Sequence, residues 1–152
     1  MDIAARLEEL GIVLPAPAKP VASYVAFVRT GNLISVSGQI SMTADQAFKG
    51  RVPDAVSLAD AILAARLSGI NILAQLNAAL EGDLNRVQRI VKLGGFVNCT
   101  ADFTDHPKVI NGASDLMVEV FGDKGKHSRA AVGTPSLPLG VSVEVDALVE
   151  VK

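Results

Sequence analysis

The residues best suited to chemistry lie in the last quarter of the chain, where Arg129 is followed fifteen residues later by Glu144. An arginine can hold a carboxylate or a phosphate through a planar fork of donors. A carboxylate held near that arginine can move a proton or position a water molecule. The pair therefore predicts a site for a small anionic substrate.

The segment around Glu144 predicts how that side chain is presented. Residues 141–151 have valine or alanine at every odd position and mostly polar residues at the even positions, where Leu148 is the exception. This alternation is typical of a strand with one buried face. Glu144 is accordingly expected on the wetter face.

Length and composition limit the class of protein. The chain has 152 residues, which predicts a single domain over 1–152, and 49% of its residues are hydrophobic while only 4% are aromatic. The core should therefore be aliphatic, and the apolar excess predicts buried faces between subunits. A formal net charge of −2 gives no electrostatic footprint for binding a phosphate backbone, so a nucleic-acid partner is not expected.

The remaining reactive side chains predict structural roles. Cys99 is the single cysteine of the chain and is expected in the core. His106 and His127 lack the clustered partners of a metal site, so we expect His106 to start a helix and His127 to lie in a loop. Because no secretory signal and no apolar run of roughly 20 residues is present, a cytoplasmic protein without a membrane partner is expected.

Helical and strand periodicities alternate along the chain. A short helix over 2–10 ends at Gly11, and three prolines make the connector that completes an N-terminal extension over residues 1–21. A core over 22–151 follows, with Gly31-Asn32 as a hairpin turn, Gly38 as the end of the second strand and Gly94-Gly95 as a bulge. The expected strands are 24–29, 33–37, 90–99, 128–132 and 141–151, and the expected helices are 57–80 and 107–121.

This order predicts an α+β fold. The sequence β-β-α-β-α-β after an N-terminal helix is typical of a mixed sheet covered on one face by two helices. The other sheet face would stay bare in a single copy, which again favours packing between subunits.

Several of these segments together resemble one family. They are Ser23 to Ile40 with its Ser-Gly-Gln, Val87 to Leu93, Val109-Ile-Asn111, Ser128-Arg129 and Val141 to Ala147. They are similar to the reactive intermediate deaminases, also called Rid, YjgF-like or "L-PSP endoribonuclease" proteins. The resemblance implies a chorismate-mutase-like (YjgF-like) fold, a homotrimer with clefts at the subunit interfaces, and hydrolysis of imines and enamines such as 2-aminoacrylate to 2-keto acids and ammonia without a cofactor.

The resemblance also implies roles for individual residues. Arg129, Glu144 and Tyr24 match the catalytic positions, while Ser37, Gly38 and Asn111 join Arg129 as substrate-binding positions. This chain departs from the family pattern at Ala131, where active deaminases usually have cysteine, serine or threonine, and in the loop over 122–128. Together with the N-terminal extension, these departures place the chain in a divergent branch.

The residue types suit such a reaction on chemical grounds. A guanidinium fork fits the carboxylate of a 2-imino acid, and a backbone N–H at Gly38 can add a second grip. Water then attacks an imine carbon that is already electrophilic, so neither a metal nor a covalent nucleophile is required. Glu144 can orient the water or carry a proton, and Tyr24 can close the cleft or donate a hydrogen bond.

Each residue also has a structural interpretation. Arg129 and Glu144 can be surface charges, Tyr24 can fill the core or an interface, Asn111 can be an ordinary helix residue, and Gly38 can simply end a strand. Three functions follow: an imine or enamine deaminase, a non-catalytic trimeric binder of a small 2-imino or 2-keto carboxylate, and, ranked last, an endoribonuclease.

Overall fold

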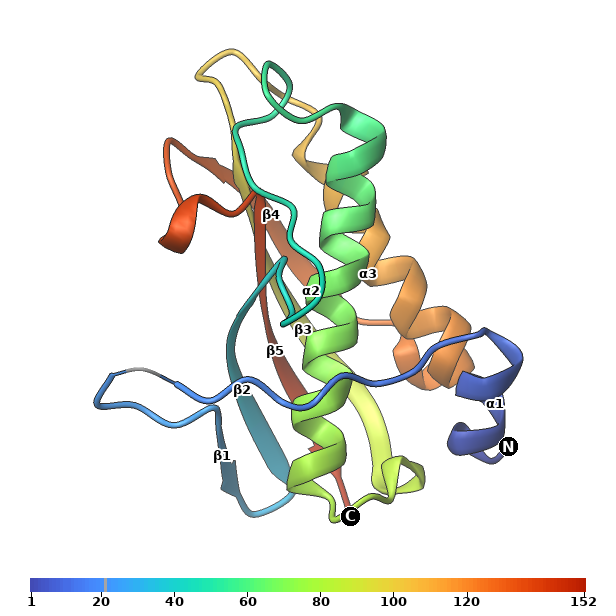
Figure 1. Cartoon of the computed structure of the whole chain (residues 1–152). Helices are drawn as coiled ribbons and strands as arrows, with labels where there is room; N and C mark the ends of the chain where they lie inside the picture. Colours follow the sequence, from blue (N-terminus) through green and yellow to red (C-terminus); the bar gives the residue numbers. More distant parts are fainter. Residues whose placement is uncertain (21) are drawn as a thin grey trace.

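The structure is a computed structural model that describes residues 1–20 and 22–152. Five strands form one sheet in the order β1-β2-β5-β3-β4 (Figure 1). The strands are β1 (Phe27–Thr30), β2 (Leu33–Ile40), β3 (Val87–Asn98), β4 (Ser128–Thr134) and β5 (Val143–Val151). Neighbours pair antiparallel except β3 and β4, which are parallel, so the sheet is mixed as expected.

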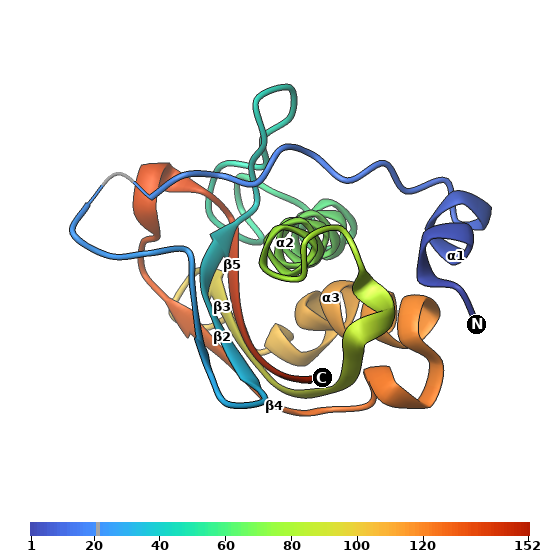
Figure 2. The ribbon, with the colours of Figure 1, turned by 90° about the horizontal axis from the view of Figure 1, so that it is seen from below.

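Two long helices, α2 (Leu58–Ala79) and α3 (His106–Phe121), cover one face of the sheet (Figure 2). The Ser57 side chain accepts a hydrogen bond from the Asp60 N–H and so caps α2, as its position predicts. Short 3₁₀ turns complete the chain at η1 (Leu84–Arg86), η2 (Gly122–Gly125) and η3 (Pro138–Gly140). The predicted α+β fold with two helices on one face is confirmed.

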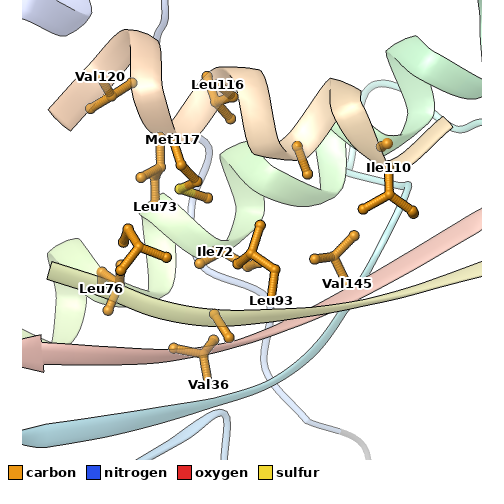
Figure 3. Packing of buried hydrophobic residues seen from close by; sticks show 14 of the residues in the cluster. Val36, Ile72, Leu73, Leu76, Leu93, Ile110, Leu116, Met117, Val120 and Val145 are labelled. Atoms are coloured by element: carbon orange, nitrogen blue, oxygen red, sulfur yellow. The ribbon is translucent and has the colours of Figure 1, made fainter. Parts of the chain in front are cut away.

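The core lies between the helices and the sheet (Figure 3). Leu116, Met117 and Val120 of α3 meet Ile72, Leu73 and Leu76 of α2, and the apolar faces of the strands close the layer from below. Gly112 lets the two helices approach closely, because a Cβ at that position would overlap the backbone carbonyl of Ile62. This close contact fixes the middle of α3 against α2.

The N-terminal helix α1 (Ile3–Glu9) packs on the helical layer rather than on the sheet (Figure 2). Ile3 and Leu7 are buried, and the Arg6 Nε donates to the Glu119 carbonyl of α3 at 2.8 Å. The chain then crosses α2, where the buried Gln75 amide donates to the Ala18 carbonyl at 2.8 Å. Helix α2 is thus covered by the sheet, by α3 and by this segment. Because it is covered on several sides, most of its residues are apolar or small.

Two expectations about glycines are wrong. Strand β2 continues past Gly38 to Ile40, with a register shift between Val36 and Gln39. The pair Gly94-Gly95 lies in regular register with β5 and forms no bulge. These two glycines instead make room for neighbours, because a Cβ would overlap Asp146 at Gly94 and Ile110 at Gly95.

Candidate functional site

Arg129 lies on β4 at the edge of the sheet and turns its side chain toward α3. Its Nη1 donates to the Asn111 Oδ1 at 2.8 Å and to the Ser114 Oγ at 3.0 Å. Its Nη2 donates to the Pro107 carbonyl at 3.1 Å. The guanidinium is therefore held at three points by one helix, and the structure brings together Arg129 and Asn111, two of the predicted site residues.

These contacts leave two donors of the guanidinium without a hydrogen-bond partner among the described residues. Arginine has five N–H donors, and the three hydrogen bonds to α3 are the ones it makes among the described residues. The two remaining donors belong to Nε and Nη2. Nitrogens on one edge of the plane are the arrangement that binds both oxygens of a carboxylate.

A second group of predicted residues gathers around Glu144. A cavity of about 210 Å³ is lined by Tyr24, Ser37, Gly38 and Glu144, together with residues from α2 and from the segment before β1. Tyr24 is 55% exposed at this cavity, so it does not fill the core. Four of the six predicted site residues thus share one concave surface.

Ser37 and Gly38 form a β-bulge beside Glu144. Val36 pairs with Ala147 and Gln39 with Val145, so Ser37 and Gly38 together stand opposite the single residue Asp146. The Ser37 hydroxyl donates to the Val25 carbonyl at 2.7 Å, which ties the chain before β1 to the bulge. The bulge positions Gly38 directly against the Glu144 carboxylate.

Burial raises the pKa of the Glu144 carboxyl above its ordinary value, and the nearby charge of Asp146 raises it further. The pKa of Asp146 is raised as well, by burial, although the Gly94 N–H and Lys92 act in the opposite direction. The surroundings of these two half-buried carboxyls on β5 therefore disfavour their ionised forms. A carboxyl in this state is suited to exchanging protons closer to neutral pH.

Arg129 and the Glu144 cavity lie on opposite faces of the sheet. Arg129 is registered with Leu93, which is buried beneath the helices, whereas Glu144 is registered with Phe96 on the bare face. One copy of the chain therefore presents two half-sites. We call them the arginine half-site (Arg129, Asn111, Ser114 and the Pro107 carbonyl) and the glutamate half-site (Tyr24, Ser37, Gly38 and Glu144).

Sequence reasoning missed Ser114 and the contact that His127 makes with it. Ser114 lies three residues after Asn111 on α3, a spacing that places both on one helical face. His127 lies in the loop before β4, as expected, and its ring is also hydrogen-bonded to the Ser114 hydroxyl at 2.8 Å. The helical spacing could have identified Ser114, but no local pattern reveals the contact across the loop.

The other residues that the sequence singled out lie in the core or at the start of a helix. Cys99 is buried, as expected, and burial raises the pKa of its thiol. His106 begins α3 and lies 3.5 Å from the Cys99 sulfur. Ala131, two residues after Arg129, packs against the core. Among the helices of the described residues, none has hydropathy and length suited to crossing a bilayer.

Comparison with known proteins identifies the family of this chain. Residues 4–151 match the family described as "YjgF/chorismate_mutase-like, putative endoribonuclease". The chain therefore belongs to the YjgF/chorismate-mutase-like family, and the predicted resemblance is confirmed. The match begins inside α1, earlier than the start at residue 22 that the motifs had indicated.

Individual relatives agree with this assignment. The chain is 45% identical to protein TCP17 of Trypanosoma cruzi over 150 residues, which covers 97% of this chain and 93% of the relative. It is similar to the crystal structure of Atu1372 from Agrobacterium tumefaciens, a protein of unknown function (TM-score 0.92, 48% identity, 99% of this chain and 92% of that one). A structure from Shewanella oneidensis described as a putative endoribonuclease has a TM-score of 0.95 at 31% identity and covers 99% of this chain and 100% of that one.

Proposed function

We propose that this protein hydrolyses reactive imines and enamines of the 2-aminoacrylate type to 2-keto acids and ammonia. The family includes the Rid deaminases, which makes this chemistry the first to consider. The observation that carries the proposal is the free Nε and Nη2 edge of Arg129, held in place by three hydrogen bonds to α3. Such an edge fits the carboxylate that every 2-imino acid bears.

The complete site is proposed to form between two copies of the chain. Because the two half-sites lie on opposite sheet faces, they cannot grip one small molecule within a single copy. The bare face of the sheet exposes Val28, Leu33 and Val132, which gives an apolar surface for self-association. A closed ring, with the trimer as the expected form, would bring the arginine half-site of each copy to the glutamate half-site of the next.

The reaction needs little beyond these groups. Arg129 holds the substrate carboxylate, with the Gly38 N–H proposed as a second donor, while an enamine first gains a proton on carbon to become the iminium. Glu144 takes a proton from water as the water oxygen bonds to the imine carbon, and the resulting carbinolamine has both OH and NH₂ on that carbon. Return of the proton to nitrogen lets ammonia leave, and Glu144 takes the hydroxyl proton as the C=O bond forms, which leaves the keto acid. That released proton equals the one that the enamine carbon gained, so atoms and charges balance.

The raised pKa of Glu144 supports its role as the proton carrier. A carboxyl with a pKa closer to neutral exchanges protons in both directions near the working pH. Tyr24, exposed at the same cavity, is placed to donate a hydrogen bond to the developing hydroxyl or to shield the substrate from solvent.

Ala131 supports a second candidate, a non-catalytic binder of small carboxylates. Active relatives are expected to have a cysteine, serine or threonine at this place, and Ala131 offers no polar atom. The arginine half-site would then serve recognition alone. Ribonuclease activity ranks third because the formal net charge is −2 and aromatic residues make up only 4% of the chain, a composition that disfavours binding an RNA backbone and stacking its bases.

A single assay separates these functions. An enzyme that eliminates water from serine supplies 2-aminoacrylate continuously, and the formation of pyruvate is followed with and without this protein. Acceleration that disappears in Arg129→Ala but persists in Arg51→Ala, an exposed arginine paired to Asp54, supports the deaminase. Full acceleration by Arg129→Ala refutes the assigned site.

The binder gives a different result. The wild-type protein would not accelerate pyruvate formation, yet pyruvate would raise its melting temperature, and Arg129→Ala would abolish that shift. Cleavage of RNA that is lost on mutation of either half-site would favour the ribonuclease instead.

A further inference from the structure

A chain of hydrogen bonds runs from the loop before β4 to Arg129. The His127 Nδ1 lies 2.6 Å from the Gly125 carbonyl, and a carbonyl only accepts, so Nδ1 bears a proton. In a neutral ring, Nε2 is then an acceptor, and the Ser114 hydroxyl at 2.8 Å donates to it. The Ser114 oxygen keeps its lone pairs for the Arg129 Nη1 at 3.0 Å. With the proton on Nδ1 and none on Nε2, each partner in the chain has a defined donor or acceptor role.

The loop that bears the Gly125 carbonyl is itself held against α3. A Cβ on Gly125 would overlap the Met117 carbonyl, so the loop backbone touches the helix directly. Gly125 is buried, and the chain turns back toward α3 at His127. The imidazole therefore bridges a fixed carbonyl and a fixed helix rather than ending in solvent.

The contact with His127 matters for Ser114 because the hydroxyl of a serine inside a helix has an alternative hydrogen-bond acceptor. Its hydroxyl commonly turns back to the carbonyl one helical turn earlier. An acceptor at the His127 Nε2 draws the hydroxyl proton to the loop side and directs the oxygen lone pairs toward Arg129. With Asn111 and the Pro107 carbonyl, this gives the guanidinium three fixed supports that define its plane.

We propose that His127 is a positioning residue that acts through Ser114 to aim the free edge of Arg129 at the substrate carboxylate. The inference rests on the proposed function in one respect, namely that Arg129 binds a carboxylate. His127 does not touch the substrate itself. Its contribution is to preorganise the guanidinium, which reduces the loss of side-chain freedom on binding.

A simpler role would be to anchor the loop through Nδ1 alone, and two substitutions distinguish the roles. The glutamine side chain reaches about as far as the imidazole Nε2, so its oxygen in His127→Gln can accept from Ser114. The asparagine side chain reaches about as far as Nδ1, so its amide in His127→Asn can donate to Gly125. The positioning role requires the first contact and loop anchoring requires the second.

Binding and kinetics give the first readout. Calorimetry measures the Kd of pyruvate, and the aminoacrylate assay measures KM and kcat. We expect His127→Gln to remain within about threefold of the wild type, while His127→Asn and Ser114→Ala each raise Kd and KM by about tenfold with a smaller change in kcat. The double variant His127→Asn with Ser114→Ala should be no worse than either single variant. The reverse ranking, with His127→Asn preserved and His127→Gln impaired, overturns the proposal.

Nitrogen NMR gives a second readout that needs no activity. The chain has two histidines, so the ring signals of His127 are assigned by comparison with a His127 variant. We expect a ring that bears a proton on Nδ1 and accepts at Nε2, and an Arg129 Nε–H signal that stays ordered in the wild type and His127→Gln but averages in His127→Asn and Ser114→Ala. A ring protonated on Nε2, or equal order of Arg129 in all variants, refutes the positioning role. Absent pyruvate binding with these signals intact instead refutes the proposed function alone.

Discussion

The Glu144 carboxylate occupies the space that a Cβ on Gly38 would fill. The two residues belong to neighbouring strands, and the bulge at Ser37-Gly38 brings them together. Glycine is thus required here for close approach and not for an unusual backbone angle. The contact makes the position of the carboxylate dependent on the absence of a side chain.

Gly38→Ala should displace Glu144 and lower kcat about tenfold to a hundredfold, because the proton carrier moves away from the substrate. Pyruvate binding at Arg129 should change much less. Steady-state kinetics and calorimetry measure the two effects. Gly94→Ala is the matched control, since its added Cβ meets Asp146 on the same sheet face and leaves the contact with Glu144 alone. Equal losses in both variants would contradict a specific role for the Gly38 contact.

Mixing two inactive variants should restore activity if each site uses two copies. Arg129→Ala and Glu144→Gln disable different half-sites, so co-refolded oligomers contain some sites with both halves intact. With equal amounts and random assembly, about a quarter of the sites recover, because each half is independently wild type about half of the time. Pyruvate formation before and after mixing measures the recovery. Sites formed within one copy would give no recovery at all.

Asp146→Asn should move the acidic limb of the pH profile to lower pH. Burial and then the Asp146 charge raise the pKa of Glu144, and the basic form of Glu144 activates water. The rate therefore falls as pH drops through this raised pKa, and removal of the like charge lowers the pKa. Burial remains, so the limb should stay above that of an ordinary glutamate. Glu150→Gln, on the same strand but exposed and distant, should leave the limb in place.

Gly112→Ala should destabilise the protein far more than Gly69→Ala, although both glycines lie where α2 meets α3. At Gly112 the new methyl meets the Ile62 carbonyl, which cannot move without shifting a helix, so a loss of about 3 kcal/mol or more is expected. At Gly69 it meets the end of the Leu116 side chain, and the better helix propensity of alanine offsets part of the strain, leaving a change within about 1 kcal/mol. Urea unfolding at fixed protein concentration compares them, and similar losses would contradict the close-approach argument.

The fold could be predicted because its signals are local. The apolar stripe and the Ser57 cap define α2, and the Gly31-Asn32 turn fixes the first hairpin. Alternation along β5 correctly places Glu144 on the wetter face. Each of these signals depends on residues a few positions apart, where helix and strand periods act directly.

The finer features of the site depend on contacts between segments whose mutual positions cannot be inferred from local sequence patterns. A glycine is compatible with a bulge or with close approach, so Gly94-Gly95 could not be distinguished from Ser37-Gly38 without the partner strand. The contact between His127 and Ser114 depends on how the η2 loop turns back on α3. The catalytic and binding roles of Arg129, Glu144, Tyr24, Ser37, Gly38 and Asn111 stay predictions.

The segment that crosses α2 also forms part of the wall around Glu144. Ala18, Lys19 and Pro20 line that cavity, and the Gln75 amide fastens Ala18 to the helix. Part of the cavity wall is thus formed by a stretch outside any helix or strand, which the buried Gln75 amide attaches to α2. Shortening or exchanging those few residues offers a way to change which small molecules the cavity admits without altering Glu144, Tyr24 or the bulge.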